Sequence, residues 1–367
     1  DLPGDEEQAD MYLQTVEFLK QYGYAQYKMN KFEEYDLYAR NKDFLVSQNI
    51  LTFTDLGGRL MALKPDVTLS IVRSTKNAAD YVEKVYYNEN VYRVAAGSDG
   101  FREILQMGLE CIGDVDTYCI GEAVQLAAKS LRCISERCVL QLSHLGVLSA
   151  AIDALGVMPE THAALLRCVG GKNLHELTAL CREAGAPEQK TAVLRSLAAM
   201  CGTPETVLPQ LRSLLPGSTA VEELEAVVEA LGADSAIVRI DFSVVNSMHY
   251  YNGIVFRGFV AGIPDSVISG GQYDRLMQKM GRRARAIGFA VYLDLLELLP
   301  HEKREFDIDA LLLYDQDASP VSVREAARSL RENGLCVMAQ RCVPEKIRSR
   351  QIWRLEESGV RLLENHA

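Results

Sequence analysis

The spacing of apolar residues predicts the first elements of the chain. Apolar positions recur at helical intervals over residues 6–22, and Gly23 then ends the predicted helix. Alternation over residues 24–32 predicts a strand, and residues 50–63 predict a β-hairpin that turns at residues 55–58.

The same mixture of strands and helices continues to about residue 148. Pro65 opens a new element, and a helix is predicted over residues 68–74. Residues 82–94 and 101–112 are two strand-like runs on either side of a Gly-Ser-Asp-Gly turn. The first part of the chain is therefore predicted to be an antiparallel sheet with helices.

The pattern changes twice in the rest of the chain. Residues 148–231 are rich in Ala, Leu and Glu with recurring Pro and Gly, which predicts a string of short helices inserted into the core. Strands are expected again over residues 236–245 and 253–260. After Arg304 the expected elements are a strand, a helix and a second strand, at residues 308–314, 321–332 and 335–339.

The pattern as a whole predicts an α+β chain in three parts. The core is formed by residues 1–147 and 232–304, the helical insertion by residues 148–231, and a small C-terminal α/β domain by residues 305–367.

Composition excludes several classes of protein. Hydrophobic residues make up 48% of the 367 residues, so global disorder is not expected. No apolar stretch approaches the ~20 residues that span a bilayer, and the acidic N-terminus has no signal-peptide core. The net charge of −11 disfavours binding of nucleic acid as the main task. Nine cysteines without a C-x-x-C pair and scattered histidines predict a cytoplasmic protein with reduced thiols and without a metal site or cofactor.

Asp66 and Thr68 are the first candidates for ligand binding. They follow Pro65 where a strand ends and a helix begins, so their side chains can project from the helix N-terminus. The alternative is an ordinary Asp/Thr helix cap.

A second candidate segment combines Arg93 with the motif Gln-Met-Gly-Leu-Glu at residues 106–110. Side chains alternate along a strand, so Gln106, Gly108 and Glu110 share one face. Gly108 is expected to leave space for a ligand between the two polar groups, which can accept an ammonium or an imidazole N–H. The alternative is polar alternation on a solvated sheet face.

Two further segments contain tyrosines and glycines. Tyr250 and Tyr251 border a predicted turn, and glycines occur within residues 269–274 and 286–290. Adjacent tyrosines are most often packing residues, and a Gly-Gly pair is weak evidence for a ligand. Each segment alone leaves the function open.

The order of these segments resembles the histidyl-tRNA synthetase lineage over about residues 5–300. The shared motifs, in chain order, are Leu-Lys-Pro-Asp-x-Thr, Tyr-Arg, Gln-x-Gly-x-Glu, Tyr-Tyr-x-Gly-x-x-Phe, Gly-Gly-x-Tyr-Asp and Ile-Gly-Phe-Ala. Several motifs in one order are far more specific than any one of them. The resemblance implies the class II aminoacyl-tRNA synthetase fold, an antiparallel sheet flanked by helices.

Two departures distinguish the chain from active synthetases. The family's arginine that engages the reacting carboxylate is replaced by Asn246. The arginine that holds the ATP phosphates is replaced by Leu295, and Tyr292 replaces a glycine of the same motif. Loss of one preorganised donor for developing charge costs ~3–4 kcal/mol, so synthetase activity is expected to be lost.

The departures make the chain more similar to the regulatory subunits of ATP phosphoribosyltransferase, which belong to the same lineage. This similarity implies a non-catalytic protein that activates the short-form catalytic subunit and confers histidine feedback inhibition on the first step of histidine biosynthesis. It also implies a homodimer within a hetero-oligomer, without tRNA or a membrane as partner. The alternative is a divergent amino-acid-binding protein of this lineage with another partner.

The resemblance further implies a site for free histidine on the sheet. The expected residues are Asp66, Thr68, Arg93, Gln106, Glu110, Tyr250 and Tyr251. The carboxylate of Asp66 and the amide oxygen of Gln106 would accept from the α-ammonium, and Arg93 would bind the carboxylate. Glu110 and Tyr251 would flank the imidazole, with Glu110 accepting a ring N–H. The alternative places the regulatory site at the interface with the catalytic subunit.

Overall fold

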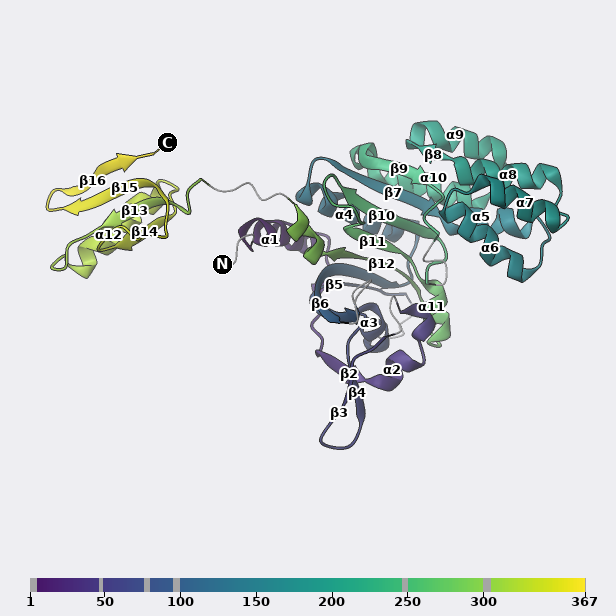
Figure 1. Ribbon diagram of the computed structural model, residues 1–367, viewed down its shortest axis with the longest axis horizontal. Coiled ribbons are helices and arrows are strands. Elements are labelled where there is room, and N and C mark those ends of the chain that lie inside the picture. The colour runs from purple at the N-terminus through teal and green to yellow at the C-terminus, as the bar shows by residue number, and fades with distance from the viewer. Residues whose placement is uncertain are drawn as a thin grey trace. The chain divides into compact units, whose positions relative to one another are not determined.

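The computed structural model describes residues 5–45, 49–75, 80–94, 100–245, 250–299 and 305–366. The chain forms two compact units, residues 1–300 and residues 301–367 (Figure 1). The three-part division expected from the sequence remains a proposal, and the helical segment lies within the first of these units.

A nine-stranded sheet is the centre of the first unit. Its order is β1-β5-β6-β12-β11-β10-β7-β9-β8. The strands are β1 (Ala25–Gln26), β5 (Val82–Val94), β6 (Phe101–Gly113), β7 (Cys138–His144), β8 (Cys201–Gly202), β9 (Val238–Asp241), β10 (Ile254–Val260), β11 (Ile268–Gln272) and β12 (Arg285–Tyr292). Neighbouring strands are antiparallel except for the β1/β5 and β7/β9 pairs, which are parallel. The antiparallel sheet expected from the sequence is confirmed, with these two parallel pairs as an addition.

Long helices cover one face of this sheet. They are α1 (Asp5–Gln21), α4 (Thr117–Ile134) and α10 (Thr219–Leu231). The Asp116 side chain caps α4 by accepting from the backbone N–H of Cys119 at 2.9 Å. A Cβ atom on Gly121 of α4 would lie 2.8 Å from the Cβ of Ala230, so this glycine allows α4 and α10 to pack closely. The main hydrophobic core lies between these helices and the sheet.

Short helices follow β7, as the composition predicts. They are α5 (Leu145–Asp153), α6 (Pro159–Gly170), α7 (Leu174–Glu183), α8 (Glu188–Ala199) and α9 (Pro204–Leu214), followed by α10. Pro159 and Pro204 occupy first helical positions, where no N–H donor is needed. The strand expected at residues 236–245 is shorter at both ends: a 3₁₀ helix (Gly232–Ile237) precedes β9, and β9 ends at Asp241.

Smaller elements cover part of the opposite face. They are α2 (Tyr35–Ala39), a 3₁₀ turn (Lys42–Phe44), α3 (Thr68–Ser74) and α11 (Asp274–Lys279), and a 3₁₀ helix (Leu293–Leu298) follows β12. A second hydrophobic cluster, which includes Tyr38, Ile71 and Tyr87, lies on this side.

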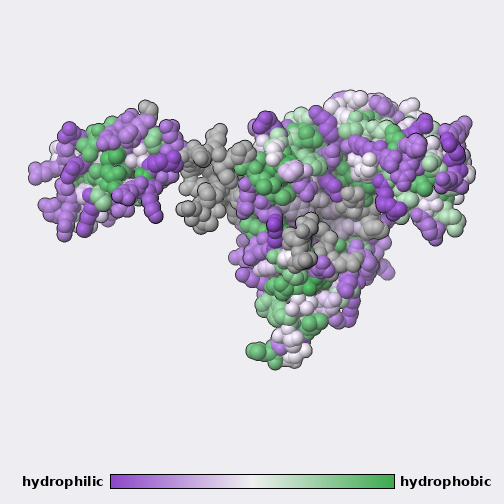
Figure 2. All heavy atoms as spheres, in the orientation of Figure 1, coloured by the Kyte–Doolittle hydropathy of each residue, from purple (hydrophilic) through white to green (hydrophobic). Residues whose placement is uncertain are grey.

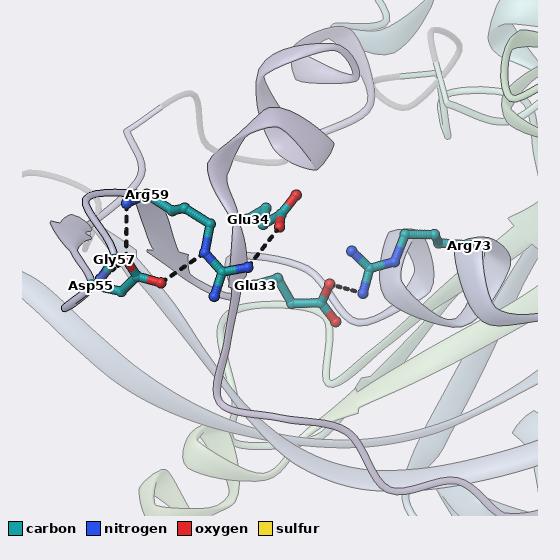
Figure 3. Close-up of polar contacts among 6 residues, drawn as sticks. All are labelled: Glu33, Glu34, Asp55, Gly57, Arg59 and Arg73. Carbon is teal, nitrogen blue, oxygen red and sulfur yellow. Dashed lines mark hydrogen bonds and ion pairs between the residues drawn. The ribbon is translucent and has the colours of Figure 1, made fainter.

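The predicted hairpin is part of a three-stranded sheet of order β2-β4-β3, with β2 (Phe32–Glu34), β3 (Thr52–Thr54) and β4 (Leu60–Leu63). The Asp55 carboxylate accepts from the backbone N–H groups of Gly57 and Arg59 at 2.9 and 2.8 Å and pairs with the Arg59 guanidinium at 2.9 Å (Figure 3). Arg59 also pairs with Glu34 at 3.4 Å, and Glu33 pairs with Arg73 of α3. These contacts join the turn, β2 and α3.

The prediction of one strand over residues 24–32 is wrong, because this segment passes from one sheet to the other. Ala25 and Gln26 pair with β5 of the large sheet, whereas Phe32 pairs with Leu63 of the small sheet. Between them, the backbone N–H of Met29 donates to the Glu89 side chain at 3.3 Å.

The second unit is a four-stranded sheet of order β14-β13-β15-β16 with one helix. Its elements are β13 (Ile308–Leu313), α12 (Pro320–Glu332), β14 (Val337–Gln340), β15 (Ser349–Glu356) and β16 (Gly359–Asn365). The strand–helix–strand prediction is confirmed, but the sequence pattern did not indicate β15 and β16. Across the residues that the structure describes, no helix has the length and apolar character needed to cross a bilayer.

Candidate functional site

A cavity of about 360 Å³ lies on the sheet face opposite α4. All seven residues that the sequence predicted as a site line this cavity, which is within the size range of small-molecule sites. Asp66 and Thr68 come from the start of α3, Arg93 from β5, Gln106 and Glu110 from β6, and Tyr250 and Tyr251 from the segment before β10. Residues far apart in the sequence therefore meet at one place.

Glycines in the sheet make room for the cavity's side chains. A Cβ atom on Gly288 would lie 1.8 Å from Glu110 Oε2, and one on Gly271 would lie 2.9 Å from the Tyr251 ring. A Cβ atom on Gly108 would lie 2.5 Å from the Tyr87 hydroxyl. The space above Gly108 is thus occupied by Tyr87, which corrects the expectation that a ligand would fill it.

Glu110 is held from both sides by hydroxyl groups. Thr68 donates to Oε1 at 2.6 Å, and Tyr273 donates to Oε2 at 2.5 Å. Burial raises the pKa of Glu110 to about 8, and the nearby Asp66 carboxylate raises it further against the lowering effect of the two hydroxyls. Burial therefore favours the protonated form of Glu110 at neutral pH.

Asp66 both caps a helix and lines the cavity. Its Oδ1 accepts from the backbone N–H of Leu69 at 2.8 Å, so the prediction of a helix cap is confirmed alongside its place in the cavity wall. Burial raises the pKa of the Asp66 carboxyl, and the charge of Arg93 opposes that rise. The Arg93 guanidinium also donates through Nε to the carbonyl of Pro65 at 2.7 Å. Arg93 is therefore engaged by the protein itself.

Gln106 contributes a donor that no described residue accepts from. Its side chain is 2% exposed, and Nε2 is buried without a hydrogen-bond partner among the described residues. A buried polar atom left unpaired costs free energy, so this N–H group favours an acceptor supplied by a ligand. The role predicted for the Gln106 amide oxygen remains a prediction.

Aromatic rings form one wall of the cavity. The ring of Tyr250 lies 4.8 Å from that of Tyr251, 5.8 Å from that of Tyr273 and 6.1 Å from that of Phe44. Burial raises the pKa of both Tyr250 and Tyr251, so their hydroxyls stay neutral. This wall suits a flat, partly apolar group such as an imidazole.

Several lining residues were not predicted as site residues. They are Asp43, Phe44, Leu45, Val67, Tyr87, Arg257, Ser269, Tyr273, Gly288, Phe289, Ala290 and Tyr292. Strand alternation did not indicate Arg257, because it places Arg257 only on the face of Val255, which is not among the lining residues. The sequence indicated Tyr292 only as the residue that replaces a glycine of the synthetase motif, yet Tyr292 also lines the cavity.

Leu295 is the one of the two replaced synthetase positions that the structure describes. Asn246 lies outside the described residues. Leu295 lies in the 3₁₀ helix after β12, is half-buried, and packs against the main hydrophobic core.

Comparisons with known proteins agree with this architecture. Residues 2–296 match the family model described as histidyl-tRNA synthetase. The ATP phosphoribosyltransferase regulatory subunit of Clostridium kluyveri is 29% identical over 329 residues, which are 85% of this chain and 84% of that protein. A crystal structure of an ATP phosphoribosyltransferase regulatory subunit/histidyl-tRNA synthetase from Bacillus halodurans has a TM-score of 0.74 and 27% identity, covering 91% of this chain and 88% of that one.

A more distant structure shows the same fold. The ATP phosphoribosyl transferase (HisG:HisZ) complex from Thermotoga maritima matches with a TM-score of 0.63 and 18% identity, covering 79% of this chain and 98% of that chain. The chain has the class II synthetase-like fold, resembles the regulatory subunits of ATP phosphoribosyltransferase, and belongs to the histidyl-tRNA synthetase family.

Proposed function

We propose that this chain is a non-catalytic regulatory subunit of ATP phosphoribosyltransferase that binds free histidine in the cavity. It activates the short-form catalytic subunit and makes that subunit sensitive to histidine. The names of the relatives support the assignment to the regulatory subunit. The cavity supports the choice of ligand.

The observation that carries the proposal is the joint arrangement of Asp66, Glu110 and the tyrosine wall around one cavity. Two carboxyl groups can accept from the α-ammonium and from a ring N–H. The aromatic wall formed by Tyr250 and Tyr251 can pack against the imidazole. Because burial favours the protonated form of Glu110, the positive charge of a bound ligand would shift this carboxyl toward its ionised form.

Tyr292 and Leu295 support the absence of synthetase activity. Tyr292 lines the cavity where related synthetases have a glycine, so its side chain takes up room that an active enzyme leaves open. Leu295 packs against the hydrophobic core and has no group that can bind a phosphate.

The proposed assembly is a homodimer within a hetero-oligomer, located in the cytoplasm with the catalytic subunit. The small sheet exposes large apolar side chains (Figure 2). These side chains are Phe32, Phe53, Leu56 and Leu60. An exposed apolar surface of this kind is typical of an interaction site and supports assembly through the first unit.

The test is co-purification with the catalytic subunit from the same organism, followed by phosphoribosyltransferase assays with and without histidine. We expect a stable complex, higher activity than the catalytic subunit alone, and inhibition by histidine. Separate species at micromolar concentration with unchanged activity would contradict the regulatory role. Histidine-dependent ATP–pyrophosphate exchange by the chain alone, at a rate typical of a synthetase, would show an enzyme instead.

A further inference from the structure

Arg257 is a cation in the cavity that has no partner among the residues that the structure describes. It lines the cavity from β10 and is half-buried. Within the part of the chain that the structure describes, it makes no hydrogen bond or ion pair. An arginine held in a cavity without a carboxylate or carbonyl partner is available to an anionic group of a ligand.

The strand register places a row of small residues beside Arg257. Arg257 pairs with Ser269 of β11, Ser269 with Ala290 of β12, and Ala290 with Gly108 of β6. Neighbouring strands lie ~4.8 Å apart, and side chains in one row share a face. The guanidinium can therefore extend above Ser269 and Ala290 toward the middle of the cavity.

The other groups of the cavity favour the same assignment. Arg93 already donates to the Pro65 carbonyl and stabilises the charge of Asp66. Gln106 offers a second donor without a partner in the described part of the chain, its buried Nε2. Two donors without a described partner and two carboxyl groups around one cavity suit an amino-acid zwitterion, which carries one carboxylate and one ammonium group.

We propose that Arg257 binds the carboxylate of the amino-acid ligand and that Arg93 acts as a positioning residue that holds Asp66. This inference rests on the proposed function, because it assumes that the cavity takes a free amino acid. It replaces the role that the sequence assigned to Arg93, and it makes recognition of the carboxylate depend on β10.

The experiment compares L-histidine with L-histidinol, which keeps the ammonium and the imidazole but has a hydroxymethyl group in place of the carboxylate. Calorimetry on the full chain would measure both ligands with wild type, Arg257→Gln, Arg257→Lys and Arg93→Gln. Thermal unfolding of each variant would verify that it is folded.

We expect wild type to prefer histidine by ~tenfold or more, which corresponds to loss of one charge-assisted contact. Arg257→Gln should weaken histidine binding by about that factor and leave histidinol within ~twofold, so that the preference disappears. Arg257→Lys should keep part of the preference, because lysine retains the charge without the paired donors. Arg93→Gln should weaken both ligands by a similar factor, because Arg93 acts through Asp66.

Two outcomes would overturn the inference, and they are distinguishable. If wild type binds histidine but Arg257→Gln keeps the preference over histidinol, the role of Arg257 is wrong and the proposed function stands. If wild type binds neither ligand, the histidine site itself fails, and the role of Arg257 fails with it.

Discussion

The two faces of the nine-stranded sheet are built from the same strands but differ in chemistry. On β6, Met107, Leu109 and Cys111 belong to the main hydrophobic core, whereas Gln106 and Glu110 line the cavity. The period of two along a strand produces this separation, because successive side chains point to opposite faces. One face is packed with apolar side chains. The other buries polar groups, only some of which form hydrogen bonds with described residues.

Because the two faces differ, we expect some residues of these strands to determine stability and others to determine ligand affinity. Apolar burial on the α4 side stabilises the sheet, so changes there should lower stability and spare the affinity of the folded protein. On the cavity side, a protonated buried carboxyl and an unpaired amide donor cost stability but offer contacts to a ligand. Changes there should affect affinity more than stability.

The largest effect is expected on the packed face, from Phe256→Ala. Phe256 is 0% exposed, and its ring lies 6.2 Å from that of Phe289 in an edge-to-face contact. Removing a buried phenylalanine ring leaves a cavity and costs ~3–5 kcal/mol. Urea denaturation should show this loss, and histidine affinity measured on the remaining folded protein should stay within ~twofold. A large fall in affinity without a fall in stability would contradict the separation.

The next effect concerns pH and the carboxyl of Glu110. Its pKa is raised from 4.5 to about 8 on folding, so the folded protein keeps a proton that the unfolded chain loses above about pH 4.5. The stabilising effect of that proton is complete below the unfolded pKa and is lost as the pH rises to the folded pKa. The free energy of unfolding should fall by up to ~1.4 kcal/mol per pH unit across this range.

Glu110→Gln removes this titration and serves as the reference. Compared with wild type by urea denaturation at pH 5, 6, 7 and 8, the variant should gain relative stability as the pH rises. A difference that does not change with pH would show that Glu110 titrates normally in the folded protein.

A third prediction compares two helix-capping aspartates, one on each side of the sheet, as a matched pair. Asp66 caps α3 on the cavity side, and Asp116 caps α4 on the packed side. Replacing either by alanine should cost ~1 kcal/mol of stability, because each loses one capping hydrogen bond. Asp66→Ala should also weaken histidine binding by ~tenfold or more, as should Glu110→Ala, whereas Asp116→Ala should not. Unchanged affinity in both Asp66→Ala and Glu110→Ala would rule out this cavity and favour a site at the subunit interface.

Most of the fold follows from local sequence pattern, whereas the site followed from the resemblance to the synthetase lineage. The strands at residues 82–94 and 101–113 and the helix over residues 68–74 were predicted closely, because their apolar periods are long or their starts are marked by proline. Strands β15 and β16 were not, since their polar positions carry charges, and the Arg350–Asp309 and Arg354–Asp315 ion pairs appear only after folding.

In the site, too, the sequence did not predict which residues contact one another. The resemblance to the synthetase lineage pointed to Glu110, but its contacts with Thr68 and Tyr273 join three separate segments. The occupant of the space above Gly108 depends on the register of β5 against β6, which places Tyr87 opposite it. A sequence pattern gives the face of a residue but not the neighbour that fills the space beside it.

The smallest effect is expected from removing one tyrosine hydroxyl on each face of the sheet. Tyr251 lies over Gly271 in the cavity, and Tyr24 belongs to the packed face, where its hydroxyl donates to Glu122 at 3.3 Å. Tyr251→Phe and Tyr24→Phe keep the rings, so each should change stability by only ~1 kcal/mol or less. The Tyr251 hydroxyl is one of the groups expected beside the imidazole, so its loss should weaken histidine binding by a few-fold, about the value of one hydrogen bond. Tyr24→Phe should leave affinity unchanged, because its hydroxyl lies on the other side of the sheet. Calorimetry with histidine on the two variants measures this difference directly, and equal affinities would show that Tyr251 contributes only its ring to the wall of the cavity.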